Sequence, residues 1–269
     1  TQRKNDGPIQ TIGTEYYMRV TVTNAVTLSG STSQCLENNL EGNTVRWLNL
    51  GTSAAKQCTL SFWVRCSLTG TFGGALVNEA YNRCHPFSYT IDTANTWEHK
   101  VVTFPADTTG AISNGTTYGM QVYWLLVSGS NSQTSALGTT WATYAGGAEG
   151  QGGQNLLDST DNNIYFTGMQ WEVGDEATEF EHRSVAEETT LCQRYYFRYT
   201  ASTSGTHIAM GHQMTSSAAK IILPFPNSMR VRPTAVETTG TATDYSVART
   251  STYEVCNSVP TFAGASKEV

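Results

Sequence analysis

Two side chains in residues 60–66, Trp63 and Arg65, have the chemistry needed to hold a sugar ring. In a strand, successive side chains point to opposite faces of the sheet. Trp63 and Arg65 therefore share one face with Ser61. On the concave face of a β-sandwich, an aromatic plane can stack on a sugar ring while a guanidinium donates to its hydroxyl groups. The alternative is that a loop covers Trp63. The opposite face is predicted to be core and carries Leu60, Phe62, Val64 and Cys66.

A second pair of candidate binding residues, Trp141 and Tyr144, lies in a long segment rich in Gly, Ser and Thr, residues 128–154. No run within this segment is long enough to predict a strand, and long loops of this kind often carry function. Trp141 and Tyr144 are predicted to present apolar surface to a glycan or to a neighbouring subunit. The alternative is that both rings pin the loop onto its own domain.

Residues that could bind a metal or catalyse a reaction do not form a known pattern. None of the five histidines belongs to an H-E-x-x-H or H-x-x-x-H pair. His207 and His212 are five residues apart in a predicted strand, which places them on opposite faces. No phosphate-binding loop, dinucleotide fingerprint or G-x-S-x-G motif occurs. The sequence therefore predicts no metal site and no cofactor.

Four acidic residues cluster in sequence after a predicted strand: Glu172, Glu176, Glu179 and Glu181. A glycosidase needs two carboxyl groups that face one cleft. Acidic residues beside Gly174, at the exit of a domain, are predicted instead to be solvated. The chain is accordingly predicted not to be an enzyme.

The overall composition favours an all-β protein and disfavours nucleic-acid binding. Charged residues make up only 14% of the 269 residues. Gly, Thr and Ser are abundant, as is typical of chains with many strands and turns. The formal net charge of −6 repels the phosphates of a nucleic acid. No apolar run reaches the roughly 20 residues that span a bilayer, so we expect no membrane insertion.

The six cysteines are scattered along the chain, without a C-x-x-C pair and without a histidine at ligand spacing. A zinc site usually shows one of these patterns, and a disulfide framework would need an oxidising compartment. We interpret the cysteines as small buried side chains or incidental thiols.

Short strand-like segments separated by clusters of Gly, Asn, Asp and Ser predict an antiparallel β-sandwich. No segment with the period of a helix lies between them, which favours two packed sheets with the topology of a jelly roll. In the last segment Gly168 interrupts the alternation, and the apolar positions are Ile164, Phe166, Met169 and Trp171. The predicted strands are residues 17–23, 44–50, 58–66, 87–91, 97–104, 120–127 and 164–171.

A short helix is predicted to separate this sandwich from a smaller β-rich unit. Ser184 and Glu187 form the S-x-x-E pattern of a capping box, which predicts a helix over residues 185–195. The strands predicted after it are residues 196–200, 207–214, 220–223, 231–238 and 253–256. The predicted organisation is an extended arm in residues 1–15, a jelly-roll sandwich in residues 16–183, and the helix with a small β domain in residues 184–269.

Residues 163–196 resemble a block that recurs in structural proteins of tailed bacteriophages. The similarity runs through FTGMQWEVG at 166–174, AT at 177–178, FEHRS at 180–184 and LCQRYY at 191–196. Residues 54–65 with 69–72, 95–98 and 107–110 look like the jelly-roll portion of the same proteins. Residues 224–234, which read PFPNSMRVRPT, are similar to their downstream segment. Most of the chain beyond residue 16 is covered by this resemblance.

The resemblance implies a virion structural protein, commonly a fibre or appendage of the tail or head, assembled in the cytoplasm of the host bacterium. Its jelly roll is expected to contact a host-surface glycan. The polar arm of residues 1–15 is expected to dock onto other virion proteins. Position 1 is Thr rather than Met, which indicates either processing or missing first residues.

A homotrimer is expected, because a unit of about 85 residues is marginal alone and fibrous phage proteins commonly pack three copies around an axis. Two alternatives stay open. The chain could be a purely architectural capsid decoration protein. It could also be a non-catalytic carbohydrate-binding module of a secreted polysaccharide-degrading enzyme, since such modules share the jelly roll and a strand of the S-F-W-V type. The segments after residue 191 favour the phage protein, because a binding module has no need of them.

Overall fold

The computed structural model describes residues 8, 11, 13–133, 138–144, 153–200, 207–215, 217–248 and 252–265. Most of the predicted arm, residues 1–15, therefore lies outside the described residues. The chain divides into two compact units, Thr1–Glu181 and His182–Val269.

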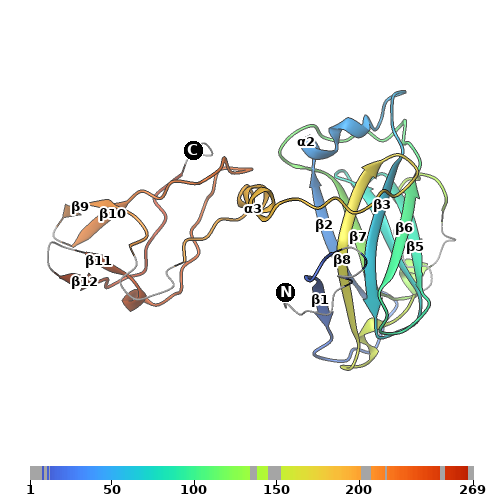
Figure 1. The fold of residues 1–269 in the computed structure, drawn as a ribbon, viewed down its shortest axis with the longest axis horizontal. Coiled ribbons are helices and arrows are strands. Elements are labelled where there is room, and N and C mark those ends of the chain that lie inside the picture. The colour runs from blue at the N-terminus through green and yellow to red at the C-terminus, as the bar shows by residue number, and fades with distance from the viewer. Residues whose placement is uncertain are drawn as a thin grey trace. The chain divides into compact units, whose positions relative to one another are not determined.

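The first unit contains two four-stranded sheets (Figure 1). The first sheet has the order β1 (Met18–Thr21), β8 (Asn163–Val173), β3 (Cys58–Cys66) and β6 (Glu98–Phe104). The second has the order β2 (Ser33–Glu41), β7 (Tyr118–Ser128), β4 (Gly70–Asn78) and β5 (Cys84–Ile91). All of these strands pair antiparallel. Two antiparallel sheets in this order form a jelly roll, which confirms the predicted fold class.

The core lies between the two sheets and confirms the face assignment of β3. Side chains from both sheets form one buried cluster. Phe62 is fully buried and packs edge to face on Tyr89 at 5.2 Å and on Trp124 at 5.7 Å between ring centroids. Every predicted core residue of β3 is at most 3% exposed: Leu60, Phe62, Val64 and Cys66.

In the first unit, one predicted strand is wrong, and two observed strands were not predicted. Residues 44–50 form the short helix α2 (Gly42–Val45) and the 3-10 helix η1 (Arg46–Leu48) instead of a strand. The strand in this region is β2, whose alternation is weak because most of its residues are polar. The other omission is β4, which contains three glycines.

The glycine content of β4 has a packing cause. A Cβ atom on Gly74 would lie 2.5 Å from the Phe87 ring and 2.5 Å from the Tyr123 carbonyl oxygen. Only glycine fits this close approach of neighbouring strands, although glycine normally weakens a strand. Because glycine is usually taken as evidence against a strand, β4, a central strand of the second sheet, was not predicted.

The interruption at Gly168 is a β-bulge in β8. Thr167 pairs with Trp63 and Gln170 pairs with Ser61, so two residues of β8 lie opposite one residue of β3. Gly168 adopts a φ of 56°, which glycine tolerates without strain. The extra residue returns Trp171 to the core side, where its ring stacks on Phe104 at 5.6 Å.

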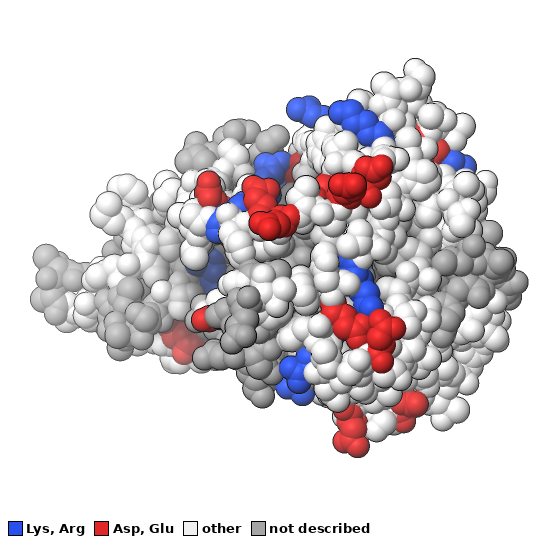
Figure 2. Space-filling view, turned by 45° about the vertical axis from the view of Figure 1, so that its right-hand side comes forward, with Lys and Arg blue, Asp and Glu red and all other residues white. Residues whose placement is uncertain are grey.

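The connections of the first unit include two short 3-10 helices, η2 (Ser130–Gln133) and η3 (Leu156–Asp158). All six cysteines are free thiols, and three of them, Cys58, Cys66 and Cys84, are buried. Figure 2 shows that charged side chains form small scattered groups on the face in view, as the low charged fraction requires.

The second unit begins with the predicted helix, α3 (Val185–Gln193). Its capping box is confirmed, because the Ser184 hydroxyl accepts from the Glu187 N–H at 3.2 Å and the Glu187 carboxylate accepts from the Ser184 N–H at 2.9 Å. Two small antiparallel pairs follow with the 3-10 helix η4 (Ala242–Asp244): β9 (Gly211–Thr215) with β10 (Ala218–Ile221), and β11 (Ser246–Ala248) with β12 (Tyr253–Val255).

Two strands predicted in this unit are wrong, those at residues 196–200 and 231–238. In the first, the alternating rings of Phe197 and Tyr199 pack on each other at 4.7 Å rather than on a sheet. The Tyr199 hydroxyl donates to the Pro224 carbonyl at 2.6 Å. In the second, Pro233 lacks the N–H that a ladder requires.

Candidate functional site

Trp63 and Arg65 lie together on the outer face of the first sheet, as the alternation predicts, and both are partly buried. The Trp63 ring stacks on His99 of β6 with 5.2 Å between centroids. The Arg65 guanidinium lies 5.1 Å from the centre of the Tyr165 ring, a cation–π distance. Each side chain is thus packed against a ring of a neighbouring strand.

The surroundings of Arg65 are a packed aromatic cluster on this face. Tyr165 also lies under the Arg19 guanidinium at 5.5 Å. Tyr17, which is buried, contacts Tyr165 at 5.2 Å and Trp97 at 5.8 Å. These contacts hold the start of β1 against the sheet. Arg65 therefore has a structural role.

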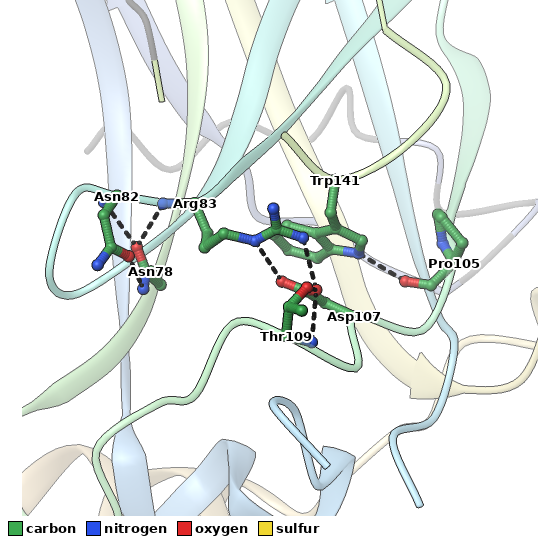
Figure 3. Close-up of polar contacts among 7 residues, drawn as sticks. All are labelled: Asn78, Asn82, Arg83, Pro105, Asp107, Thr109 and Trp141. Carbon is green, nitrogen blue, oxygen red and sulfur yellow. Dashed lines mark hydrogen bonds and ion pairs between the residues drawn. The ribbon is translucent and has the colours of Figure 1, made fainter. Parts of the chain in front are cut away.

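The Trp141 side chain faces the core of the first unit and is held there by several contacts. Its indole N–H donates to the Pro105 carbonyl at 2.6 Å (Figure 3). Its ring meets His85 edge to face at 5.6 Å and packs against the main core cluster. For Trp141 the geometry corresponds to the alternative in which the ring pins the loop onto its own domain.

Tyr144 points to the other side of the same segment. Ala142 forms a β-bridge with Cys84, with both N–H to carbonyl distances 2.9 Å, so residues 138–144 run along the edge strand β5. Tyr144 packs against a second apolar cluster on the outer face of the second sheet. It also meets Tyr81 edge to face at 6.0 Å. The structure therefore does not bring Trp141 and Tyr144 together as one platform.

Tyr144 borders a groove of about 280 Å³ on the outer face of the second sheet. The register of β2 on β7 builds its floor, because Cys35 pairs with Leu125 and Glu37 pairs with Tyr123. We call this feature the tyrosine groove. The residues that line it are Ser33, Cys35, Glu37, Tyr81, Gln121, Tyr123, Leu125, Ser132 and Tyr144.

A buried amide organises the polar side of the tyrosine groove. Gln121 is 4% exposed, and its side-chain nitrogen donates to the Glu37 carboxylate and to the Asn39 side-chain oxygen, both at 3.0 Å. Its side-chain oxygen accepts from the Tyr81 hydroxyl at 2.8 Å. Because all three partners are satisfied through one buried group, their positions are coupled.

Tyr81 is held at the groove by the turn between β4 and β5. The side-chain oxygen of Asn78 accepts from the Asn82 N–H at 3.1 Å and from the Arg83 N–H at 3.0 Å (Figure 3). This turn places Tyr81 at a φ of 51° with 45% of the residue exposed. Burial and the nearby oxygens of Tyr118 and Glu37 raise the pKa of Tyr81, so its hydroxyl stays a neutral donor.

The same turn is anchored by an ion pair between Arg83 and Asp107. The guanidinium donates to the two carboxylate oxygens at 2.9 and 2.6 Å, a bidentate geometry (Figure 3). Thr109 donates to the carboxylate through its N–H at 3.1 Å and through its hydroxyl at 2.8 Å. Burial opposes ionisation, but these four donors outweigh it and lower the pKa of Asp107 to about 2.

The four glutamates at the end of β8 and in the turn after it are solvated or form that turn. Glu172 accepts from the Thr178 N–H at 3.0 Å and from the Thr178 hydroxyl, which fixes the turn after β8. Glu176, Glu179 and Glu181 are exposed. Among the residues that the structure describes, no three His, Cys, Asp or Glu side chains gather as metal ligands. Within the same residues, no helix is long and apolar enough to cross a bilayer.

The tyrosine groove can hold a ligand that combines apolar faces with hydroxyl groups. Tyr81, Tyr123 and Tyr144 supply aromatic rings, and Glu37 with the serine hydroxyls supplies acceptors and donors. A sugar has this combination of surfaces. Sequence reasoning named Tyr144 as a candidate but did not name Tyr81, Gln121 or Tyr123. The sequence did contain one feature that could have indicated Tyr81, namely an aromatic residue within a polar turn.

Comparisons with known proteins find structural likenesses but no sequence family. No family model and no curated protein matches the chain. A solved structure described as "CBM4 structure and function" is 12% identical with a TM-score of 0.31, over 59% of this chain and 71% of that chain. The enzymatically active domain of tailspike protein 4 of bacteriophage CBA120 is 9% identical with a TM-score of 0.24, over 59% of this chain. Only 19% of that tailspike chain is covered, and neither likeness reaches a level that bears on function.

Proposed function

We propose that the protein is a non-catalytic bacteriophage virion component, a fibre or other appendage, that attaches to a host-surface glycan through the tyrosine groove. The observation that carries the binding role is the groove itself, which is lined by three tyrosine rings and by polar groups that Gln121 holds in place. The virion assignment rests on the resemblance of residues 163–196 and 224–234 to tailed-phage structural proteins. We further propose that the arm of residues 1–15 docks onto other virion proteins.

The groove favours binding over hydrolysis. A glycosidase needs two carboxyl groups separated by about 5–9.5 Å across the scissile bond. Among the described residues that line the groove, Glu37 is the one with a carboxyl group. The ligand is therefore held and not cleaved. A carbohydrate-binding module of a secreted enzyme shares this chemistry, and genes adjacent to the coding gene distinguish the two: capsid or tail genes support the virion protein, and a glycosidase gene supports the module.

Tyr81→Ala and Tyr144→Ala are each expected to weaken glycan binding about tenfold or more. The estimate takes ring stacking to contribute about 1–3 kcal/mol, by analogy with bases on aromatic side chains. Binding is measured on a glycan array and to whole host cells, and circular dichroism checks the fold. Trp63→Ala is the matched control, because Trp63 is an aromatic residue on the outer face of the other sheet. Loss of binding in Trp63→Ala with normal binding in the tyrosine variants would move the site to the first sheet.

The second unit is expected to assemble the chain into a homotrimer. None of its described residues is buried, and apolar side chains such as Met210 and Ile222 are 91% and 76% exposed. A unit without buried side chains gains little from folding alone, whereas packing against two further copies would cover this surface. Three linked sites would also raise avidity by roughly 10²–10⁴ without a new contact.

Light scattering on the full chain and on a truncation that ends at Arg183 tests the assembly. We expect a trimer for the full chain and a monomer for the truncation. A monomeric full-length chain at micromolar concentration contradicts the proposal.

A further inference from the structure

We infer that the tyrosine groove selects uncharged oligosaccharides and discriminates against acidic ones, through the fixed carboxylate of Glu37. The inference rests on the proposed function, because it assigns the ligand class of the same groove. It adds Glu37 as a specificity-determining residue and Gln121 as the residue that positions Glu37.

Glu37 gives the groove a single charge. Among the nine described residues that line the groove, Glu37 is the one with a carboxyl group, and no Lys or Arg is among them. Burial and Glu37 raise the pKa of Cys35 to about 11, so its thiol stays neutral. An anionic ligand therefore finds a like charge in the groove and no cation to balance it. Unpaired like charges across an interface exclude wrong partners.

Gln121 keeps this charge in place. Its side-chain nitrogen donates to one Glu37 oxygen at 3.0 Å, and the Cys35 thiol donates to the other at 3.6 Å. Rotation of the Gln121 amide would turn its oxygen toward the carboxylate and break its bond from the Tyr81 hydroxyl. Glu37 is exposed but thus tied to the floor of the groove. A sugar hydroxyl can donate to such a carboxylate, whereas a uronate or a phosphate group is repelled.

The test uses an array of neutral cello-, malto- and galacto-oligosaccharides printed beside the same oligosaccharides oxidised at C6 to uronates. We expect the wild-type full chain to bind its preferred neutral oligosaccharide at least about tenfold more tightly than the matched uronate. Glu37→Gln keeps the size and most hydrogen bonds of the side chain but removes its charge. In this variant the preference is expected to fall below about threefold, because the like charge that repels the uronate is gone.

Glu176→Gln is the matched control, because it removes one exposed glutamate charge after β8 of the other sheet. This variant is expected to keep the wild-type preference. Equal or tighter binding of uronates by the wild type, lost in Tyr81→Ala, overturns the charge selection and leaves the groove as the glycan site. If Glu37→Gln keeps the wild-type preference for neutral oligosaccharides, the charge selection by Glu37 is overturned as well. Binding to no member of the array overturns both this inference and the proposed glycan attachment.

Discussion

Phe62→Ala is expected to destabilise the sandwich by about 3–5 kcal/mol, the typical cost of removing a buried phenylalanine ring. Phe62 is 0% exposed, and its ring contacts Tyr89, Trp124 and Phe166 from both sheets. Because three rigid rings surround the site, the cavity left by the substitution cannot close easily. The loss is a large part of the 5–15 kcal/mol that stabilises a typical domain.

Urea unfolding followed by tryptophan fluorescence measures this effect on the first unit alone, because all six tryptophans lie within Thr1–Glu181. Val101→Ala is the control, since Val101 lies on the neighbouring strand and is 48% exposed. We expect Val101→Ala to lower the free energy of unfolding by less than about 1 kcal/mol. Similar losses for Phe62→Ala and Val101→Ala would contradict the position of the core between the sheets.

Asp107→Asn is expected to cost about 2 kcal/mol of stability at pH 7 and much less near pH 2. Asp107 is 3% exposed, and its pKa is lowered to about 2 from about 3.9 in an unfolded chain. A carboxyl group with a lowered folded-state pKa contributes its full stability above the unfolded-state pKa. The contribution disappears as the pH falls through the folded-state value, so wild type and variant converge in acid.

Unfolding curves at a series of pH values between 7 and 2 measure this convergence. Asp161→Asn serves as the reference, because Asp161 is an exposed aspartate in the turn before β8. A difference between wild type and Asp107→Asn that stays constant or grows toward acid would show that the Arg83 ion pair does not lower the pKa of Asp107. Since Arg83 anchors the turn that carries Tyr81, the same variant is also expected to weaken glycan binding.

The sequence was sufficient to predict the parts of the fold where one face of a strand is buried. In β3 the alternation is complete, so the core face of Leu60 to Cys66 and the outward direction of Trp63 and Arg65 followed directly. The capping box of Ser184 and Glu187 is a local pattern and was equally predictable. By contrast β4 depends on contacts of Gly74 with strands that are distant in sequence.

The tyrosine groove could be predicted only in part, because it depends on strand register. Every residue of β7 after Tyr118 is buried, since a second apolar cluster covers its outer face. The sequence of β7 therefore shows no alternation that would mark Gln121 and Tyr123 as outward-facing. In the sequence, Trp141 and Tyr144 look alike, because both are aromatic residues in a loop rich in Gly, Ser and Thr. The bridge between Ala142 and Cys84 fixes this loop on β5, and the sequence does not show which side of the loop each ring then faces.

Hydroxyl-radical footprinting of the full chain, with and without a bound neutral oligosaccharide, tests the central proposal most directly. The readout is the oxidation of Tyr81 and Tyr144 in the tyrosine groove compared with that of Trp63 on the other sheet. The proposal predicts that the oligosaccharide protects Tyr81 and Tyr144 and leaves Trp63 unchanged. Protection of Trp63 with unchanged oxidation of both tyrosines would contradict it.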